Sequence, residues 1–81
     1  MLSNKEIEEF LLQNDTVTVA EVEGDGYQYH LKIVSSEFSG KSKVMRQKWV
    51  YQQLNEYITS GRLHALNMET FSQDEWEKNH G

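Results

Sequence analysis

The first hydrophobic residues of the chain recur at the spacing of one helix face: Ile7, Phe10 and Leu11. Ser3 and Glu6 have the separation of a capping box, in which each side chain satisfies a backbone N–H group of the other residue. Leu2 and Ile7 have the separation of a hydrophobic staple around the same helix start. The pattern therefore predicts a helix that begins after Ser3 and ends near Asn14.

Two strand patterns follow this helix, joined by a turn. Residues 16–23 are rich in β-branched side chains, which favours a strand. Its apolar residues alternate in two phases, so the buried face stays open: Val17 with Val19, and Ala20 with Val22. Residues 27–33 alternate strictly between apolar and polar, and the apolar set is Tyr27, Tyr29, Leu31 and Ile33. The glycines of Gly24-Asp25-Gly26 suit a tight turn, so the two strands are predicted to form a hairpin.

One long helical pattern occupies the middle of the chain, from about residue 42 to residue 60. Its apolar side chains form a single stripe: Val50, Tyr51, Leu54, Tyr57 and Ile58. Phe38-Ser39-Gly40 ends the preceding strand, and Gly61 stands where a glycine commonly ends a helix.

A third strand and a short helix complete the pattern. Residues 63–71 are predicted as a strand, with Leu66 and Met68 directed inward. The next helix start repeats the earlier signals, with Ser72 and Glu75 as a capping box and Phe71 and Trp76 as a staple. The order is α-β-β-α-β-α, with a break in the long helix as the alternative, and helices on one face of a three-stranded sheet make an α+β fold. We expect one domain, residues 1–81, because the chain shows no repeat, proline or linker.

Composition narrows the class of protein. The 81 residues are 37% hydrophobic and 26% charged, with a net charge of -5 and a mean hydropathy of -0.75, as in small globular domains. The absence of cysteine excludes a disulfide, a thiolate zinc site and a thiol nucleophile within the chain. No apolar run approaches the roughly 20 residues of a membrane helix. The first residues carry no signal-peptide pattern, so we expect a cytoplasmic protein.

The charges are unevenly distributed. Residues 1–25 contain seven acidic residues and one base, whereas residues 41–48 contain no acid and four bases: Lys41, Lys43, Arg46 and Lys48. Lysines at a helix N-terminus oppose the helix dipole, so we interpret this cluster as a contact surface for phosphates or an acidic partner. The alternative is a solvated helix face, and the net negative charge opposes non-specific binding to nucleic acid.

Three histidines are the candidates for chemistry: His30, His64 and His80. His64 lies two positions before Leu66 on the same strand face, which by itself indicates an amphipathic side chain at the rim of the core. His30 lies on the polar face of its strand, and His80 is expected in a solvated tail. The chain has no hydrolase, nucleotide-loop or zinc-protease motif, so we expect no enzyme.

Residues 38–58 resemble the signature of the BolA-like family: Phe-x-Gly, a basic helix start, Val-Tyr, and then Leu and Glu before the helix ends. Residues 62–66 and 71–76 continue the resemblance with the right spacing, and Gly24-Asp25-Gly26 is similar to the short-loop bacterial subgroup, the acid-stress BolA paralogue type. The resemblance covers almost the whole chain. It implies the order α-β-β-α-α-β-α, similar to a type II KH domain, with the long helix broken near Trp49.

The resemblance also implies an adaptor rather than an enzyme. BolA-like proteins bind a monothiol glutaredoxin and share a [2Fe–2S] cluster with it and with glutathione, in iron–sulfur trafficking or in iron and stress sensing. The histidine of the family falls on His64, which makes His64 the expected metal ligand. A chain without cysteine holds no such cluster alone, but it can add an imidazole to a partner's thiolates. We expect a monomer when free, with a homodimer as the alternative, and no membrane partner.

Some positions depart from the family pattern. The usual second His or Cys of the family is Gln28 here, and His30 follows on the same strand face, about 6–7 Å along the strand. His30 is therefore a secondary metal candidate. Arg46-Gln47-Lys48 keeps two charges of the family's Arg-His-Arg but not its histidine, and Ser72-Gln73 keeps the helix cap of the family's Thr-Pro.

Two other functions stay open. Some bacterial BolA-like proteins are DNA-binding transcriptional regulators of stress responses, and the basic helix start at 41–48 would then contact phosphates, with a steep salt dependence. The sequence lacks the Gly-x-x-Gly loop with which KH domains clamp nucleic acid. The remaining alternative is a docking module that binds glutaredoxin without a metal, with an affinity that does not depend on His64.

Overall fold

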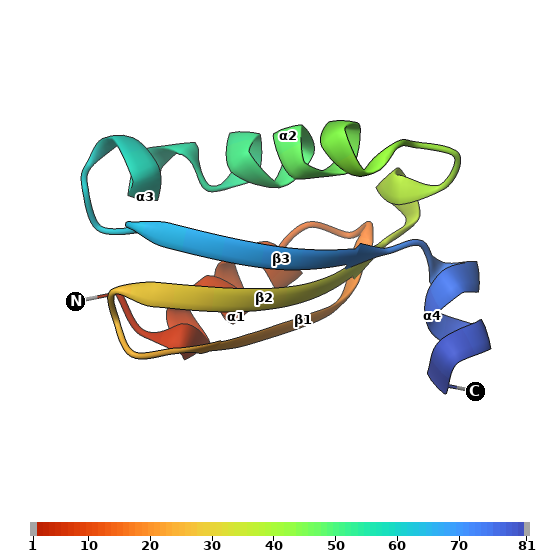
Figure 1. Ribbon diagram of the computed structural model, residues 1–81, viewed down its shortest axis with the longest axis horizontal. Coiled ribbons are helices and arrows are strands. Elements are labelled where there is room, and N and C mark those ends of the chain that lie inside the picture. The colour runs from red at the N-terminus through yellow and green to blue at the C-terminus, as the bar shows by residue number, and fades with distance from the viewer. Residues whose placement is uncertain (1, 81) are drawn as a thin grey trace.

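Three strands and four α-helices make up the part of the chain that the structure describes (Figure 1). This computed structural model describes residues 2–80 and the side chains of residues 2–78, so the side chain of His80 lies outside the described residues. The elements in chain order are α1 (Asn4–Leu12), β1 (Val17–Gly24), β2 (Gln28–Ser35), a short 3-10 helix (Ser36–Phe38), α2 (Lys43–Gln53), α3 (Asn55–Thr59), β3 (Ala65–Phe71) and α4 (Gln73–His80). This order confirms the α-β-β-α-α-β-α prediction.

The strands form one mixed sheet in the order β1-β2-β3. β1 and β2 pair antiparallel, which confirms the predicted hairpin. β2 and β3 pair parallel, and α2 and α3 make the crossover that a parallel pair requires. The parallel register aligns Gln28 with Ala65, so the residues just before β3 lie beside the hairpin loop.

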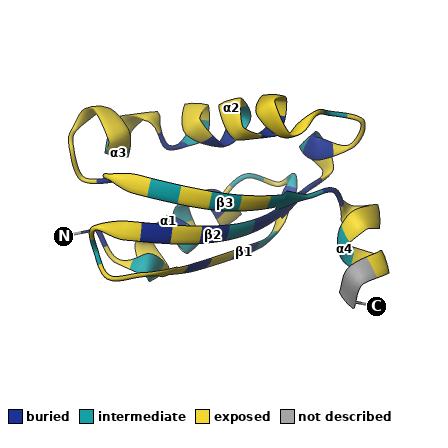
Figure 2. Cartoon of the chain, in the orientation of Figure 1, coloured by how far each residue is buried: buried dark blue, intermediate teal, exposed yellow. Residues whose placement is uncertain are grey.

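The core lies between one face of the sheet and the helices α1 to α3. In β2 the residues from Gln28 to Ile33 alternate (Figure 2), and Tyr29, Leu31 and Ile33 are buried, as predicted. The last two residues of the strand, Val34 and Ser35, are buried as well. Tyr27, predicted as a member of the same set, is 64% exposed because it lies in the loop before β2. The core cluster is Leu2, Ile7, Leu11, Val17, Ala20, Val22, Tyr29, Leu31, Ile33, Phe38, Val50, Leu54 and Leu63.

A β-bulge resolves the two phases of β1. The pairing register shifts between Val17 and Val19, which leaves Thr18 as the extra residue. The shift turns Val17 onto the same face as Ala20 and Val22, and all three side chains are buried. The strand therefore has one buried face, although its sequence alternates in two phases.

The long predicted helix is two helices that meet at Leu54. The break near Trp49 that the resemblance implied is wrong, because α2 continues through Trp49 to Gln53. Leu54 has φ of -95° and ψ of 10° and is fully buried, and the turn brings Tyr57 against Phe10 with ring centroids 5.2 Å apart. The break leaves two residues of the predicted apolar stripe exposed: Tyr51 and Ile58.

Both predicted capping boxes are present. The N–H groups of Ser3 and Glu6 each donate to the other side chain at 3.1 Å. The N–H of Ser72 donates to Glu75 at 2.7 Å, and the N–H of Glu75 donates to the Ser72 hydroxyl at 3.3 Å. The staple of α4 is also formed, with ring centroids 5.3 Å apart: Phe71 and Trp76. Among the described helices none has the length and apolar character needed to cross a membrane.

Candidate functional site

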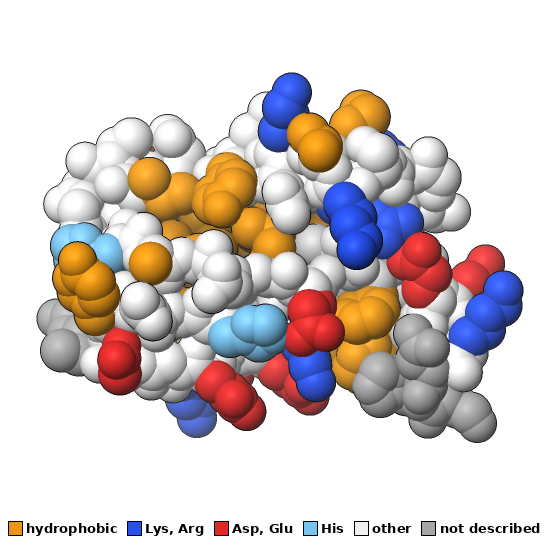
Figure 3. Space-filling model, viewed as in Figure 1, with side chains coloured by type: hydrophobic (Ala, Val, Ile, Leu, Met, Phe, Trp, Pro, Cys, Tyr) orange, Lys and Arg blue, Asp and Glu red, His pale blue; other side chains and the backbone are white. Residues whose placement is uncertain are grey.

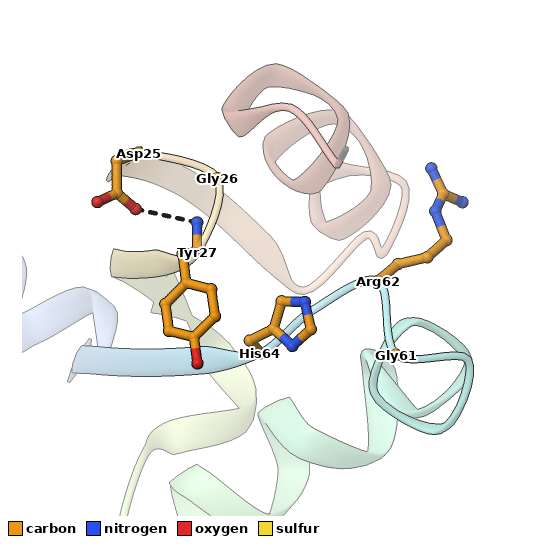
Figure 4. Close-up of a pocket in the computed structure, with 6 residues that line it drawn as sticks. All are labelled: Asp25, Gly26, Tyr27, Gly61, Arg62 and His64. Carbon is orange, nitrogen blue, oxygen red and sulfur yellow. Dashed lines mark hydrogen bonds between the residues drawn. The ribbon is translucent and has the colours of Figure 1, made fainter.

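His64 lies at one end of the sheet, immediately before β3 and beside the loop that joins β1 to β2 (Figure 4). Its ring stacks on that of Tyr27, with centroids 5.1 Å apart and planes at 21°. The N–H of Ala65 donates to the carbonyl of Tyr27 at 3.3 Å, which extends the parallel pairing beyond the strand ends. His64 is exposed at the rim of the core, where the sequence pattern placed it.

The hairpin loop is held by its own hydrogen bonds. One carboxylate oxygen of Asp25 accepts the N–H groups of Gln28 and Tyr27, both at 2.9 Å. These two bonds, the one from Gln28 first, lower the pKa of Asp25. Gly26 has φ of 93°, in the region that favours glycine. The loop therefore presents the ring of Tyr27 to His64 in a defined place.

A pocket of about 430 Å³ opens beside the stacked rings and is lined by Asp25, Gly26, Tyr27, Gly61, Arg62 and His64. Figure 4 shows the Arg62 side chain pointing away from the imidazole. Its guanidinium lies 5.3 Å from the centroid of the Tyr57 ring and 3.4 Å from the Glu6 carboxylate. Hydrogen bonds from Ser3, and to a smaller extent the charge of Arg62, lower the pKa of Glu6. The Arg62 guanidinium is therefore paired outside the pocket, and no ion pair to His64 is formed among the described residues.

The imidazole of His64 is available to an external ligand. Its ring stacks on Tyr27, and no described residue donates to or accepts from its ring nitrogens. Across the described side chains no three His, Asp or Glu residues are placed to hold a metal ion. Imidazole is the commonest protein ligand for metals, and His64 presents an imidazole at the surface of this pocket.

The structure does not bring His30 together with His64. His30 lies on the open face of the sheet, and its Nε2 is 2.7 Å from the carboxylate of Glu69. This hydrogen bond lowers the pKa of Glu69. His30 is aligned with Asn67, three positions beyond His64, so the two residues are about 10 Å apart along the strand direction and on opposite faces. Gln28 is exposed on the same face as His30.

Arg46 is a structural residue, which corrects its assignment to a partner or nucleic-acid surface. It is only 7% exposed, and its guanidinium pairs with both carboxylate oxygens of Glu75 at 2.7 and 3.3 Å. It also donates to the backbone carbonyls of Lys41 at 2.9 Å and Thr70 at 3.3 Å. The hydrogen bond from Arg46 and then that from the Ser72 N–H lower the pKa of Glu75 to about 2. Arg46 thus ties α2 to β3 and α4.

The three lysines of the predicted cluster stay near the surface. Lys41 forms an ion pair with Glu37 at 3.2 Å, four residues before it. Lys43 and Lys48 are exposed, and no described carboxylate pairs with either. Lys43 lines a hollow with Thr70 at the carboxyl end of β3, far from His64 at the opposite end of that strand.

Tyr27 is the site residue that the sequence did not indicate. Its place in an alternating apolar pattern predicted that its side chain would be buried in the core. The parallel register that sets it beside His64 joins two segments 37 residues apart, and neither segment alone contains that information. The available signal was local: the aspartate of Gly24-Asp25-Gly26 accepts the next N–H groups, which places Tyr27 in the turn.

Comparison with known proteins supplies the context of this site. A family profile described as "BolA-like protein" matches residues 6–75. The chain is 42% identical over 57 residues to an uncharacterized protein of the rpoN-murA intergenic region of Acinetobacter guillouiae, covering 70% of this chain and 69% of that protein. It is 32% identical over 77 residues to the acid stress protein IbaG of Escherichia coli, covering 95% and 92%.

Solved structures of BolA proteins superpose on this chain. The bolA protein homologue from Coxiella burnetii superposes with a TM-score of 0.83 at 27% identity, over 95% of this chain and 99% of that one. The BolA domain of SufE1 from Arabidopsis thaliana superposes with a TM-score of 0.75 at 33% identity, over 89% and 93%. The α+β fold predicted from the sequence is therefore confirmed.

Proposed function

The chain belongs to the BolA-like protein family, and on this premise we propose that it is an adaptor that binds a monothiol glutaredoxin. In this proposal His64 contributes one ligand to a [2Fe–2S] cluster shared with that partner and with glutathione. The adaptor acts in iron–sulfur trafficking or in iron and stress sensing. The name of the E. coli relative, an acid stress protein, supports the stress role.

The observation that carries the proposal is the exposed imidazole of His64 at the mouth of a pocket, without an internal hydrogen-bond or ion-pair partner among the described residues. His30, by contrast, has its Nε2 2.7 Å from the carboxylate of Glu69. The ring nitrogens of His64 have no partner among the described residues, so they can bind a group outside the chain. Tyr27 covers one face of the ring and leaves its edge, where the nitrogens lie, to solvent.

The donor set fits a shared cluster. The chain has no cysteine, and His64 is the histidine among the residues that line the pocket, so in this proposal the chain supplies one imidazole and the partner and glutathione supply thiolates. Imidazole in place of thiolate raises the potential of such a cluster, as in Rieske centres. His64 thereby sets the ligand type, Tyr27 orients the ring, and the hairpin loop holds Tyr27 in place.

Visible circular dichroism tests this function. Cluster-loaded monothiol glutaredoxin is mixed with the purified chain, and the spectrum is followed for the wild type, His64→Ala and His30→Ala. His30→Ala is the matched control, because it removes the same side chain from the other face of the sheet. We expect a changed spectrum for the wild type and for His30→Ala, and no change for His64→Ala.

Two outcomes contradict the proposal in different ways. If a complex forms in gel filtration but the spectrum never changes, the chain docks without contributing a ligand. If no complex forms, the chain does not bind glutaredoxin, and DNA binding by the three surface lysines becomes the function to examine: Lys41, Lys43 and Lys48. DNA binding would give a salt dependence that corresponds to about three phosphate contacts.

A further inference from the structure

The outward face of α2 is apolar where a solvated helix would be polar. Half of the six large hydrophobic residues that are exposed in the described chain lie on this helix: Val44 at 60%, Met45 at 55% and Tyr51 at 42%. Helical spacing of 100° per residue puts them on one side of α2 together with Lys48 and Gln52. Lys41 precedes the helix and lines the same hollow as Met45 and Lys48. We refer to these six residues as the α2 outer surface.

Folding does not account for these apolar residues. All three side chains are exposed, and none belongs to the buried core cluster. Val44 is β-branched and therefore a poor residue for an exposed helical position. A shallow hollow of about 410 Å³ beside them, lined by Lys41, Met45, Lys48, Trp49 and Gln52, could receive an apolar side chain. Contiguous exposed apolar side chains with a polar rim are typical of protein contact surfaces.

The charge of this surface is opposite to that of the rest of the chain. No acidic residue occurs between Glu37 and Glu56, whereas the whole chain carries a net charge of -5. Lys48 lies at the centre of the surface and pairs with no described carboxylate. Figure 3 shows basic and hydrophobic side chains next to each other over α2, and acidic side chains over the strands. The charge distribution therefore favours contact with an acidic partner at this surface over contact elsewhere on the chain.

The α2 outer surface is separate from the pocket of His64. The start of α2 lies beside the carboxyl end of β3, since Lys43 and Thr70 line one hollow. Thr70 is six residues beyond His64, which corresponds to about 20 Å along the strand. The outer surface also faces away from the sheet, because the opposite side of α2 carries the buried Arg46 and Val50.

We propose that the α2 outer surface docks an acidic amphipathic helix of a partner protein, with apolar side chains against Val44, Met45 and Tyr51 and carboxylates beside Lys48. The proposal goes beyond the function of His64, because it gives the adaptor a second and independent contact surface. Nucleic acid is the weaker match, since phosphates would pair with the lysines but would leave the three apolar side chains exposed.

A labelled peptide of about 18 residues, five helical turns, serves as the probe. Its leucines lie on one face with glutamates on both flanks, and a scrambled peptide of the same composition is the control. Fluorescence anisotropy with the full chain measures the affinity, and amide chemical shifts locate the contact. We expect the patterned peptide to bind, the scrambled peptide to bind at least about tenfold more weakly, and the shifts to map to residues 41–52.

Variants on two sides of α2 make the test specific. Met45→Ser and Lys48→Glu are expected to weaken binding by about tenfold each, whereas Lys43→Glu, which changes the same charge on the other flank, leaves it unchanged. His64→Ala also leaves peptide binding unchanged, so failure of this proposal is distinguishable from failure of the cluster function. Thermal unfolding checks that each variant is folded.

Four results would overturn the proposal. The first is the absence of peptide binding, and the second is a shift map outside α2. The third is tighter binding of a 20-base-pair DNA duplex that depends on both Lys43 and Lys48 but not on Met45, which would assign the surface to nucleic acid. The fourth is concentration-dependent self-association that Met45→Ser abolishes, which would assign it to a second copy of the chain.

Discussion

Replacement of Arg46 by alanine removes a buried charged side chain that joins three elements of the fold, α2, β3 and α4. The side chain donates to carbonyl oxygens of Lys41 and Thr70 and pairs with both carboxylate oxygens of Glu75. Its guanidinium carbon also lies 5.8 Å from the centroid of the Phe38 ring. Arg46→Ala removes all of these contacts at once, so its cost can be worked out contact by contact.

Each backbone carbonyl that loses its donor costs about 1 kcal/mol. The pair with Glu75 contributes about 1 kcal/mol rather than the full value of a buried pair, because the Glu75 side chain is 47% exposed and water screens it. Loss of the contact with the Phe38 ring adds about 0.5 kcal/mol. The expected loss is therefore about 3.5 kcal/mol, which lowers the melting temperature of a domain of this size by about 14–28 °C.

Urea unfolding of the wild type and the variant, followed by tryptophan fluorescence and by far-ultraviolet circular dichroism, measures the free energy of unfolding. Lys48→Ala is the matched control on the same helix and is expected to change this free energy by less than about 0.5 kcal/mol. Arg46→Lys keeps the charge but cannot pair with both carboxylate oxygens of Glu75 at once. Its free energy of unfolding should therefore lie between those of Arg46→Ala and Lys48→Ala. If Arg46→Ala costs no more than Lys48→Ala, Arg46 is a surface residue and the structural role derived above is wrong.

Three further predictions concern other parts of the fold. The lowered pKa of Glu75 means that its contribution of about 1 kcal/mol is fully present above pH 4.5 and is lost as the pH falls toward 2; urea unfolding across this range should show a smaller acid loss for Glu75→Gln than for the wild type, and an equal loss would contradict the assignment. Gly24→Ala should destabilise the chain by about 1–3 kcal/mol, because a methyl group there would clash with the backbone carbonyl oxygen of Gln28 and lie 2.9 Å from Cδ1 of Tyr29. Equal melting temperatures for this variant and the wild type would show that β1 and β2 do not approach so closely. Tyr27→Ala should move the imidazole proton resonances of His64 downfield by removing the stacked ring, whereas Tyr27→Phe should preserve their positions; no shift in the alanine variant would mean that the rings are not stacked in solution.

The features that could be predicted from the sequence depend on interactions within a few residues. The capping boxes of Ser3 with Glu6 and of Ser72 with Glu75 are fixed by a three-residue separation, and both form as predicted. The alternation along residues 28–33 reports the two faces of one strand, and it placed the buried side chains correctly. Local spacing was therefore sufficient for the order of the elements and for most of the core.

The features that could not be predicted depend on partners far along the chain. The bulge at Thr18 is needed because Val17 must face the same core as Ala20, and that core is completed by helices elsewhere in the sequence. Arg46 looks like one of four exposed bases until Glu75, 29 residues later, is placed beside it. For this reason a basic run in a sequence does not specify which of its charges reaches solvent.

The candidate site also combines a feature that could be predicted from the sequence with one that depends on distant parts of the chain. His64 could be named from a family resemblance, and its exposed position at the rim of the core agreed with the strand pattern. The stacking of His64 on Tyr27 could not be predicted, because the parallel register of β2 and β3 is a property of the assembled sheet. That register also puts His30 on the other face, where its neighbour is Glu69.

Pulsed electron paramagnetic resonance of the reduced complex tests the central claim, that His64 is a ligand of a cluster shared with the partner. The chain is labelled uniformly with ¹⁵N, and the glutaredoxin and glutathione are left unlabelled, so a ¹⁵N hyperfine coupling can come only from this chain. We predict one strong coupling in the wild type and in His30→Ala, and its loss in His64→Ala. A complex that contains the cluster but shows no ¹⁵N coupling, or one that keeps the coupling in His64→Ala, would contradict the assignment.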